Sequence, residues 1–188
     1  MTSKIRSFLA IELDNTLKED IIKVQNEFKK FDSNIKFVNP NNFHLTLKFF
    51  GDIDLNCADK ISSLIQNTLN SYNSFDLELK STGAFPNNNH IKVLWIGFKN
   101  NDILTNLQKD LDNEFFKLGF KKERDYKSHL TIARVKGSKN RDLIKKTLEN
   151  NKNITIGKMK VSKIHLKKST LTPNGPIYED LKVFDVTK

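Results

Sequence analysis

The chain lacks the features that mark disulfide-bonded, secreted and membrane-spanning proteins. Cys57 is its one cysteine, so no internal disulfide can form, and no Cys or His lies near it at metal-ligand spacing. The apolar run near the N-terminus covers only residues 8–11 before Glu12 interrupts it, which is too short for a signal peptide or a membrane span. We therefore expect a soluble, cytoplasmic protein with no membrane contact.

Metal-binding motifs are absent from the sequence as well. It holds no His-Glu-x-x-His, no His-x-His and no carboxylate cluster with ligand spacing. We therefore expect neither a bound metal nor another cofactor.

What the sequence does contain is a globular composition with a strong positive charge. Of its 188 residues, 37% are hydrophobic and 14 are Phe, which is enough for the core of one domain over residues 1–188, built as two pseudo-equivalent lobes. The net charge of +10 suits a polyanionic partner, because basic side chains that meet phosphates release condensed counterions. Lysines scattered over solvated faces would give the same charge, so the charge alone does not identify a partner.

The hydrophobic periodicity predicts strands and helices that mix without strict alternation. The expected strands cover residues 4–13, 43–50, 75–80, 91–98, 129–134, 160–168 and 177–186. The expected helices cover residues 14–31, 56–72, 102–118 and 139–150, and Thr16 with Glu19 could form a capping box for the first. A turn at residues 173–176 would join the last two strands into a hairpin. This order favours an α+β fold with antiparallel sheets over a doubly wound fold.

Two of the predicted strands carry the same triplet, His-Leu-Thr. Residues i and i+2 of a strand share a face, so His44 projects with Thr46, and His129 projects with Thr131. Thr is about one residue in sixteen here, so chance places Thr two residues after two of the four histidines only a few times in a hundred. Burying such polar groups unpaired would cost about 1–3 kcal/mol each, so they must face water or a partner. We expect the two strands to share one cleft.

Strict alternation also places the neighbours of the triplets. It puts Lys48 on the polar face with His44, and Phe49 on the apolar face. It puts Arg134, which follows the second triplet, on the face away from His129. A contact between Arg134 and a shared ligand would therefore need a bulge or a strand end, and a structural ion pair is an equally good interpretation.

Two imidazoles on either side of one phosphorus suit the hydrolysis of a phosphodiester. Near neutral pH one ring can be neutral and accept a proton while the other is charged and donates one. Threonine hydroxyls can hydrogen-bond the non-bridging oxygens. A cyclic phosphate adds ring strain, so no metal is required.

These motifs, and the segments around them, resemble the two-histidine (2H) phosphoesterases, in the branch of RNA 2',3'-cyclic phosphodiesterases that are also called 2'-5' RNA ligases (LigT-like). The resemblance covers nearly the whole chain. One departure is Ser128, where the family usually has Pro before the second triplet. The segments that carry the resemblance are residues 6–11, 37–40, 43–51, 83–86, 93–97, 129–134 and 169–179.

The resemblance implies a bilobal fold in which two antiparallel sheets face a central cleft and helices lie outside. It implies hydrolysis of a 2',3'-cyclic phosphate at an RNA end, tRNA-like or other, to a 2'-phosphate. We expect the enzyme to be a monomer. His44 would be the acid that protonates the leaving O3' and His129 the base that activates water, although these roles could be swapped. Thr46 and Thr131 would hold the phosphate. The reverse reaction would join RNA ends through a 2'-5' linkage with the same groups.

The remaining candidates have more than one interpretation. The resemblance suggests a phosphate or ribose contact for Arg134, and Phe85, expected in a loop, could stack on a terminal base or belong to the core. His165 is expected to be solvated and His90 to lie at a loop tip. Two other functions stay open: a cyclic phosphodiesterase that acts on a small nucleotide such as an ADP-ribose derivative, and an RNA-binding module without turnover.

Overall fold

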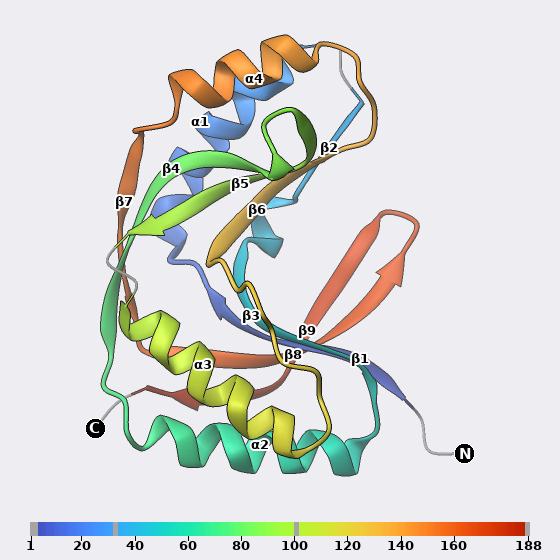
Figure 1. The fold of residues 1–188 in the computed structure, drawn as a ribbon. Coiled ribbons are helices and arrows are strands. Elements are labelled where there is room, and N and C mark those ends of the chain that lie inside the picture. The colour runs from blue at the N-terminus through green and yellow to red at the C-terminus, as the bar shows by residue number, and fades with distance from the viewer. Residues whose placement is uncertain (1–3, 32–33, 100–101, 187–188) are drawn as a thin grey trace.

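The computed structural model describes residues 4–31, 34–99 and 102–186, which form a curled sheet with helices on its outside (Figure 1). The strands of this part are β1 (Ile5–Glu12), β2 (Ile35–Phe37), β3 (His44–Ile53), β4 (Phe75–Asn87), β5 (His90–Lys99), β6 (His129–Val135), β7 (Thr155–Val161), β8 (Lys163–Thr172) and β9 (Gly175–Asp185). Its α-helices are α1 (Lys18–Lys29), α2 (Leu55–Leu69), α3 (Asp102–Lys117) and α4 (Arg141–Asn150). Short 3-10 turns at Asn15–Leu17 and Pro40–Asn42 precede α1 and β3.

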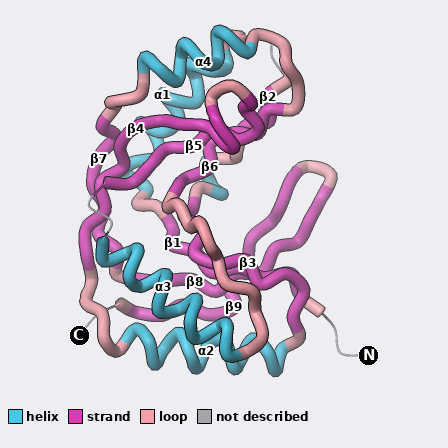
Figure 2. Tube along the Cα trace, in the orientation of Figure 1, coloured by secondary structure: helices cyan, strands magenta, loops and turns pink. Residues whose placement is uncertain are grey.

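The sheet runs in the order β7-β4-β5-β6-β3-β1-β8-β9, with β2 also paired to β6. The pairings between these strands are antiparallel. Leu45 of β3 pairs with Leu130 of β6, and this contact joins the two halves of the sheet. Helices α1 and α4 lie along one half and α2 and α3 along the other (Figure 2). The predicted bilobal α+β fold is confirmed, and the two expected sheets are continuous through the β3–β6 pair.

Apolar side chains from both halves pack into one hydrophobic core. Leu45 and Leu130 are fully buried where the halves meet, and α1 adds Ile21 and Phe28, which are also fully buried. Residues seven apart share one face of a helix, so this face of α1 turns toward the sheet. Burying each such side chain stabilises the fold by about 1.5–3 kcal/mol. No helix in the described ranges is long and apolar enough to cross a membrane.

The start of α1 differs from the prediction. Asp14 caps the 3-10 turn that precedes α1: its Oδ1 accepts hydrogen bonds from the Thr16 backbone N–H at 2.9 Å and from the Thr16 hydroxyl at 2.8 Å. The chain then makes a 3-10 turn over Asn15–Leu17 before α1 begins at Lys18. The capping box expected of Thr16 and Glu19 is therefore wrong, because Thr16 lies inside the 3-10 turn, where its hydroxyl donates to Asp14, and Leu17 is the N-cap of α1 and makes no side-chain cap.

Strands β4 and β7 were misjudged from the sequence. Strand β4 runs to Asn87, so Phe85 lies in a strand and not in a loop, and its peptide bond to Pro86 is cis. Strand β7 was missed, and the single strand expected over residues 160–168 is the end of β7 followed by β8. Gly157 weakened the strand pattern, but a Cβ there would lie 2.6 Å from the Leu17 side chain. The glycine permits the close approach of β7 to the turn before α1.

Candidate active site

The two His-Leu-Thr triplets lie directly side by side. The antiparallel pairing of Leu45 with Leu130, continued by one residue each way, sets His44 opposite Thr131 and Thr46 opposite His129. The leucines point into the core with 0% exposure. All four polar side chains therefore project from the other face of the sheet, which we call the active face. The structure thus brings together the four residues that the sequence singled out.

Each histidine ring is held by the same backbone contact. The Nδ1 atom of His44 lies 2.7 Å from the Asn42 carbonyl oxygen, and Nδ1 of His129 lies 2.7 Å from the Lys127 carbonyl oxygen. A carbonyl only accepts hydrogen bonds, so Nδ1 must carry the proton in both rings. This leaves Nε2 as the atom that exchanges protons in each ring.

Burial lowers the pKa of both histidines below the ordinary value of 6.5. For His44, burial is the largest cause, the hydrogen bond to the backbone carbonyl opposes it, and the positive charge of Lys167 adds to the lowering. For His129, burial again comes first, its carbonyl contact opposes it, and Arg134 adds to the lowering. Both rings are therefore mainly neutral at pH 7 in the free protein. An anionic phosphate between them would favour protonation of one ring.

Aromatic side chains pack against both histidine rings. The His44 ring lies 5.0 Å from the Phe8 ring and 5.3 Å from the Tyr178 ring. The His129 ring meets Phe85 edge to face at 4.8 Å. These contacts restrict ring rotation, so the Nε2 atoms have defined directions. Of the sequence candidates, Phe85 therefore does lie in the site, packed on a histidine.

Arg134 reaches the active face through a β-bulge. Trp95 of β5 pairs with Thr131 and the next residue, Leu94, pairs with Ala133, so Ile132 is one extra residue in β6. The bulge reverses the alternation, and the exposed Arg134 returns to the face of Thr131. Burial is the largest cause of the lowered pKa of His129, and the carbonyl contact opposes it. The positive charge of Arg134 adds to the lowering, as expected for a nearby cation. The sequence indicated that Arg134 could contact a shared ligand only through a bulge or a strand end, and the structure has such a bulge.

Strand β3 contains a β-bulge of the same kind. Ala10 pairs with Thr46 and Leu9 pairs with Lys48, which leaves one extra residue between them in β3. Lys48 consequently turns into the protein, with 4% exposure, and Phe49 turns out onto the active face, with 66% exposure. The prediction that placed Lys48 beside His44 and Phe49 in the core is therefore wrong.

The two bulges give the triplets matching surroundings. Phe49 lies five residues after His44, and Arg134 lies five residues after His129. Each of these side chains reaches the active face because one extra residue follows the triplet. The exposed ring of Phe49 on β3 therefore occupies a position equivalent to that of the Arg134 guanidinium on β6.

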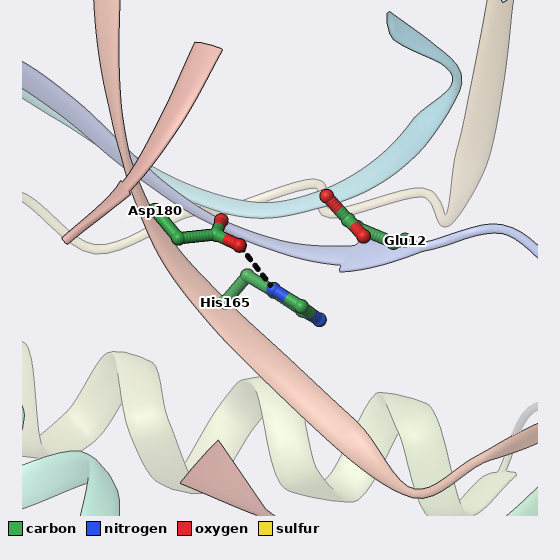
Figure 3. Close-up of side chains that lie close together, drawn as sticks. All are labelled: Glu12, His165 and Asp180. Atoms are coloured by element: carbon green, nitrogen blue, oxygen red, sulfur yellow. Dashed lines mark hydrogen bonds and ion pairs between the residues drawn. The ribbon is translucent and has the colours of Figure 1, made fainter. Parts of the chain in front are cut away.

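Sequence reasoning missed the network of charged and titratable groups that β1, β8 and β9 form on the side of His44. They are Glu12, His165, Lys167 and Asp180, and Figure 3 shows three of them. His165 was expected to be solvated, but it is only 9% exposed and its Nδ1 lies 3.2 Å from Asp180 Oδ2. Alternation along β8 could have paired His165 with Lys167, but nothing local in the sequence places that strand beside β1. His90 is exposed next to the β4–β5 turn, as predicted.

Known proteins are similar in sequence to this chain over nearly its full length. The chain matches the family model described as LigT like Phosphoesterase over residues 11–95 and 97–178. The RNA 2',3'-cyclic phosphodiesterase of Methanothermobacter thermautotrophicus is 44% identical over 181 residues, which cover 96% of this chain and 98% of that protein. The protein of the same name from Methanocaldococcus jannaschii is 43% identical over 178 residues, 95% of this chain and 99% of that protein.

Solved structures share the fold. A protein of Thermus thermophilus superposes with a TM-score of 0.82 at 24% identity and covers 96% of this chain and 97% of its own. LigT of E. coli in its apo form superposes with a TM-score of 0.77 at 22% identity, over 99% of both chains. The family model covers most of the chain, and the relatives are far above 30% identical over nearly all of it. The chain therefore belongs to the LigT-like phosphoesterase family.

Proposed function

We propose that this chain is an RNA 2',3'-cyclic phosphodiesterase that opens the cyclic phosphate to a 2'-phosphate without a metal ion. The observation that carries the proposal is the pair of histidines on adjacent strands, each with Nδ1 held by a carbonyl and Nε2 left for proton exchange. The family and the names of the relatives support this substrate class. We infer that residues 1–188 act as one unit, a soluble cytoplasmic monomer.

The proposed reaction needs one proton acceptor and one proton donor. His129, neutral, takes a proton from water at Nε2, and the water oxygen forms a bond to phosphorus. The bond between phosphorus and O3' breaks, and His44, protonated at Nε2, gives its proton to O3'. Acid–base catalysis of this kind contributes about 10²- to 10⁴-fold to the rate. The same steps, with an RNA 5'-hydroxyl in place of water as the group that bonds to phosphorus, would give 2'-5' ligation.

Groups beside the histidines suit the remaining parts of the substrate. The hydroxyls of Thr46 and Thr131 would donate hydrogen bonds to the non-bridging oxygens, and Arg134 would add a charge-assisted contact to the phosphate. Phe49 offers an exposed ring on the active face, and base stacking on such a ring is worth about 1–3 kcal/mol. Phe85 packs on His129, so we assign it to the wall that meets the ribose or base.

The test is incubation of the protein with an RNA that ends in a 2',3'-cyclic phosphate, in the presence of EDTA. We expect ³¹P NMR to show a 2'-phosphate product for the wild type. His44→Ala and His129→Ala should each lower kcat/KM by about 10²- to 10⁴-fold, because each removes one proton-transfer group. His90→Ala is the matched control: it removes an exposed histidine outside the site and should leave the rate unchanged.

The possible outcomes separate the alternatives. If the wild type leaves both the RNA cyclic end and a small cyclic nucleotide intact, only an RNA-binding module without turnover remains. A 3'-phosphate product would reverse the leaving-group assignment. Faster turnover of a small cyclic nucleotide, such as an ADP-ribose derivative, than of RNA would make the small nucleotide the substrate.

A further inference from the structure

Four charged or titratable side chains form a network on the active face next to His44. The ammonium of Lys167 donates hydrogen bonds to Glu12 Oε1 at 2.5 Å and to Asp180 Oδ1 at 2.6 Å. The other oxygen of Asp180 lies 3.2 Å from Nδ1 of His165 (Figure 3). The network thus connects three strands, β1, β8 and β9.

The strand register directs this network toward the catalytic histidine. Glu12 pairs with His44 across β1 and β3. Lys167 pairs with Phe8 across β8 and β1, and the Phe8 ring lies 5.0 Å from the His44 ring. Phe8 and Glu12 are four residues apart on one strand, so they share the active face. Lys167 therefore lies on the same face as His44, two strands away.

Lys167 takes the place that a metal ion would need. Ligand atoms of Glu12, His165 and Asp180 lie within 4.8 Å of one another, a grouping that resembles a metal site. The ammonium already bonds both carboxylates, and the Lys167 side chain is only 8% exposed. Burial alone would lower the pKa of Lys167, but the hydrogen bonds to Asp180 and Glu12 outweigh burial and raise it. The chain thus supplies its own permanent cation to these carboxylates.

We propose that Lys167, anchored by Glu12 and Asp180, is a positioning residue that holds a fixed positive charge beside His44 and so controls when His44 takes up its proton. The ammonium adds to the effect of burial in keeping the His44 ring neutral in the free protein, and the arriving anionic phosphate then makes protonation favourable. Glu12 acts in the opposite sense and limits the effect. The assignment rests on the proposed function only in that His44 is a catalytic acid or base.

The charged and titratable groups that face His44 come from four strands. They are Glu12 of β1, His129 of β6, Lys167 of β8 and Tyr178 of β9. Burial is the largest cause of the lowered pKa of His44. Lys167 and His129 lower the pKa further, whereas the Asn42 carbonyl and Glu12 raise it. The two members of one ion pair therefore have opposite effects on the same ring. Removing each of them in turn gives a test with two opposite signs.

The test is a proton NMR titration of the four imidazoles in the protein without substrate, with His44 assigned from the His44→Gln spectrum. In Lys167→Met, which keeps the length of the side chain, His44 should titrate at higher pH than in the wild type. In Glu12→Gln it should titrate at lower pH. Lys167→Arg should keep the wild-type midpoint, since it keeps the charge.

Lys168→Met is the matched control. Lys168 is the next residue of β8, points to the other face and pairs with the exposed Glu179 at 3.1 Å. Its loss should not move the His44 midpoint. An unchanged or lower midpoint in Lys167→Met, or a shift of the same sign in both Lys167→Met and Glu12→Gln, would overturn the proposal. Glu12 is half exposed, so Glu12→Gln remains informative even where Lys167→Met fails to fold.

The rate of the same variants separates this inference from the proposed function. If the enzyme opens cyclic phosphates, the pH profile of kcat/KM should move in the same direction as the His44 midpoint in each variant. If no turnover occurs with any RNA, the proposed function fails, but the midpoint shifts would still establish the control of His44 by Lys167.

Discussion

The buried ion pair between Lys48 and Asp112 should be a main determinant of stability near the site. The β3 bulge turns Lys48 inward, where its Nζ lies 2.6 Å from Asp112 Oδ1, with side chains 3% and 7% exposed. Nζ also donates to the Lys121 carbonyl at 2.5 Å, and Asp112 accepts the backbone N–H of Glu123 at 2.9 Å. We expect Asp112→Asn to destabilise the fold strongly, because it leaves a buried ammonium without its main partner.

The size of the effect follows from what remains around the ammonium. Removing one partner of a buried pair costs about 3–5 kcal/mol. The Glu123 carboxylate stays 3.4 Å from Nζ and is 46% exposed, so we expect the lower end of this range, about 3 kcal/mol. For a domain of this size, 1 kcal/mol corresponds to about 2–4 °C in Tm, so Tm should fall by roughly 6–12 °C.

Urea unfolding followed by circular dichroism would measure this loss. Glu114→Gln on the same helix is the control: it breaks an exposed pair with Lys117 and should change stability by less than about 0.5 kcal/mol. The double variant Lys48→Met/Asp112→Leu should recover most of the lost stability, since it leaves no unpaired charge. A loss below about 1 kcal/mol for Asp112→Asn would refute the reasoning.

Three further predictions concern the reaction. The pKa of both His44 and His129, the proposed acid and base, is lowered. Since the base must be neutral while the acid is protonated, kcat/KM should peak on the acid side of 6.5; a rate profile with its maximum above pH 7 would contradict this. Arg134→Ala should lower kcat/KM by about 10- to 100-fold through loss of a charge-assisted contact, with partial recovery in Arg134→Lys; equal rates for all three proteins would exclude the contact. Phe49→Ala should weaken RNA binding by about 5- to 150-fold with little change in Tm, because the ring is exposed; stacking is excluded if KM is unchanged.

The same-face geometry of the triplets could be predicted because it is local. A strand alternates with period two, so the spacing of His44 from Thr46 and of His129 from Thr131 decided that each pair projects together. The buried leucines between them anchor both strands. The repeat of the triplet was enough to predict one shared site, and helix periodicity was enough to predict the four α-helices of the described ranges.

The positions beyond the triplets depended on pairing between strands that are distant in sequence. In a bulge, two residues of one strand lie opposite one residue of the neighbouring strand, so the sequence of one strand alone does not reveal it. The bulges after Thr46 and Thr131 sent Lys48 into the core and brought Phe49 and Arg134 onto the active face. The charges around His44 likewise came together only because β8 pairs with β1. Local alternation thus determined that each His projects with its Thr, whereas long-range hydrogen bonding between strands determined which side chains surround these pairs.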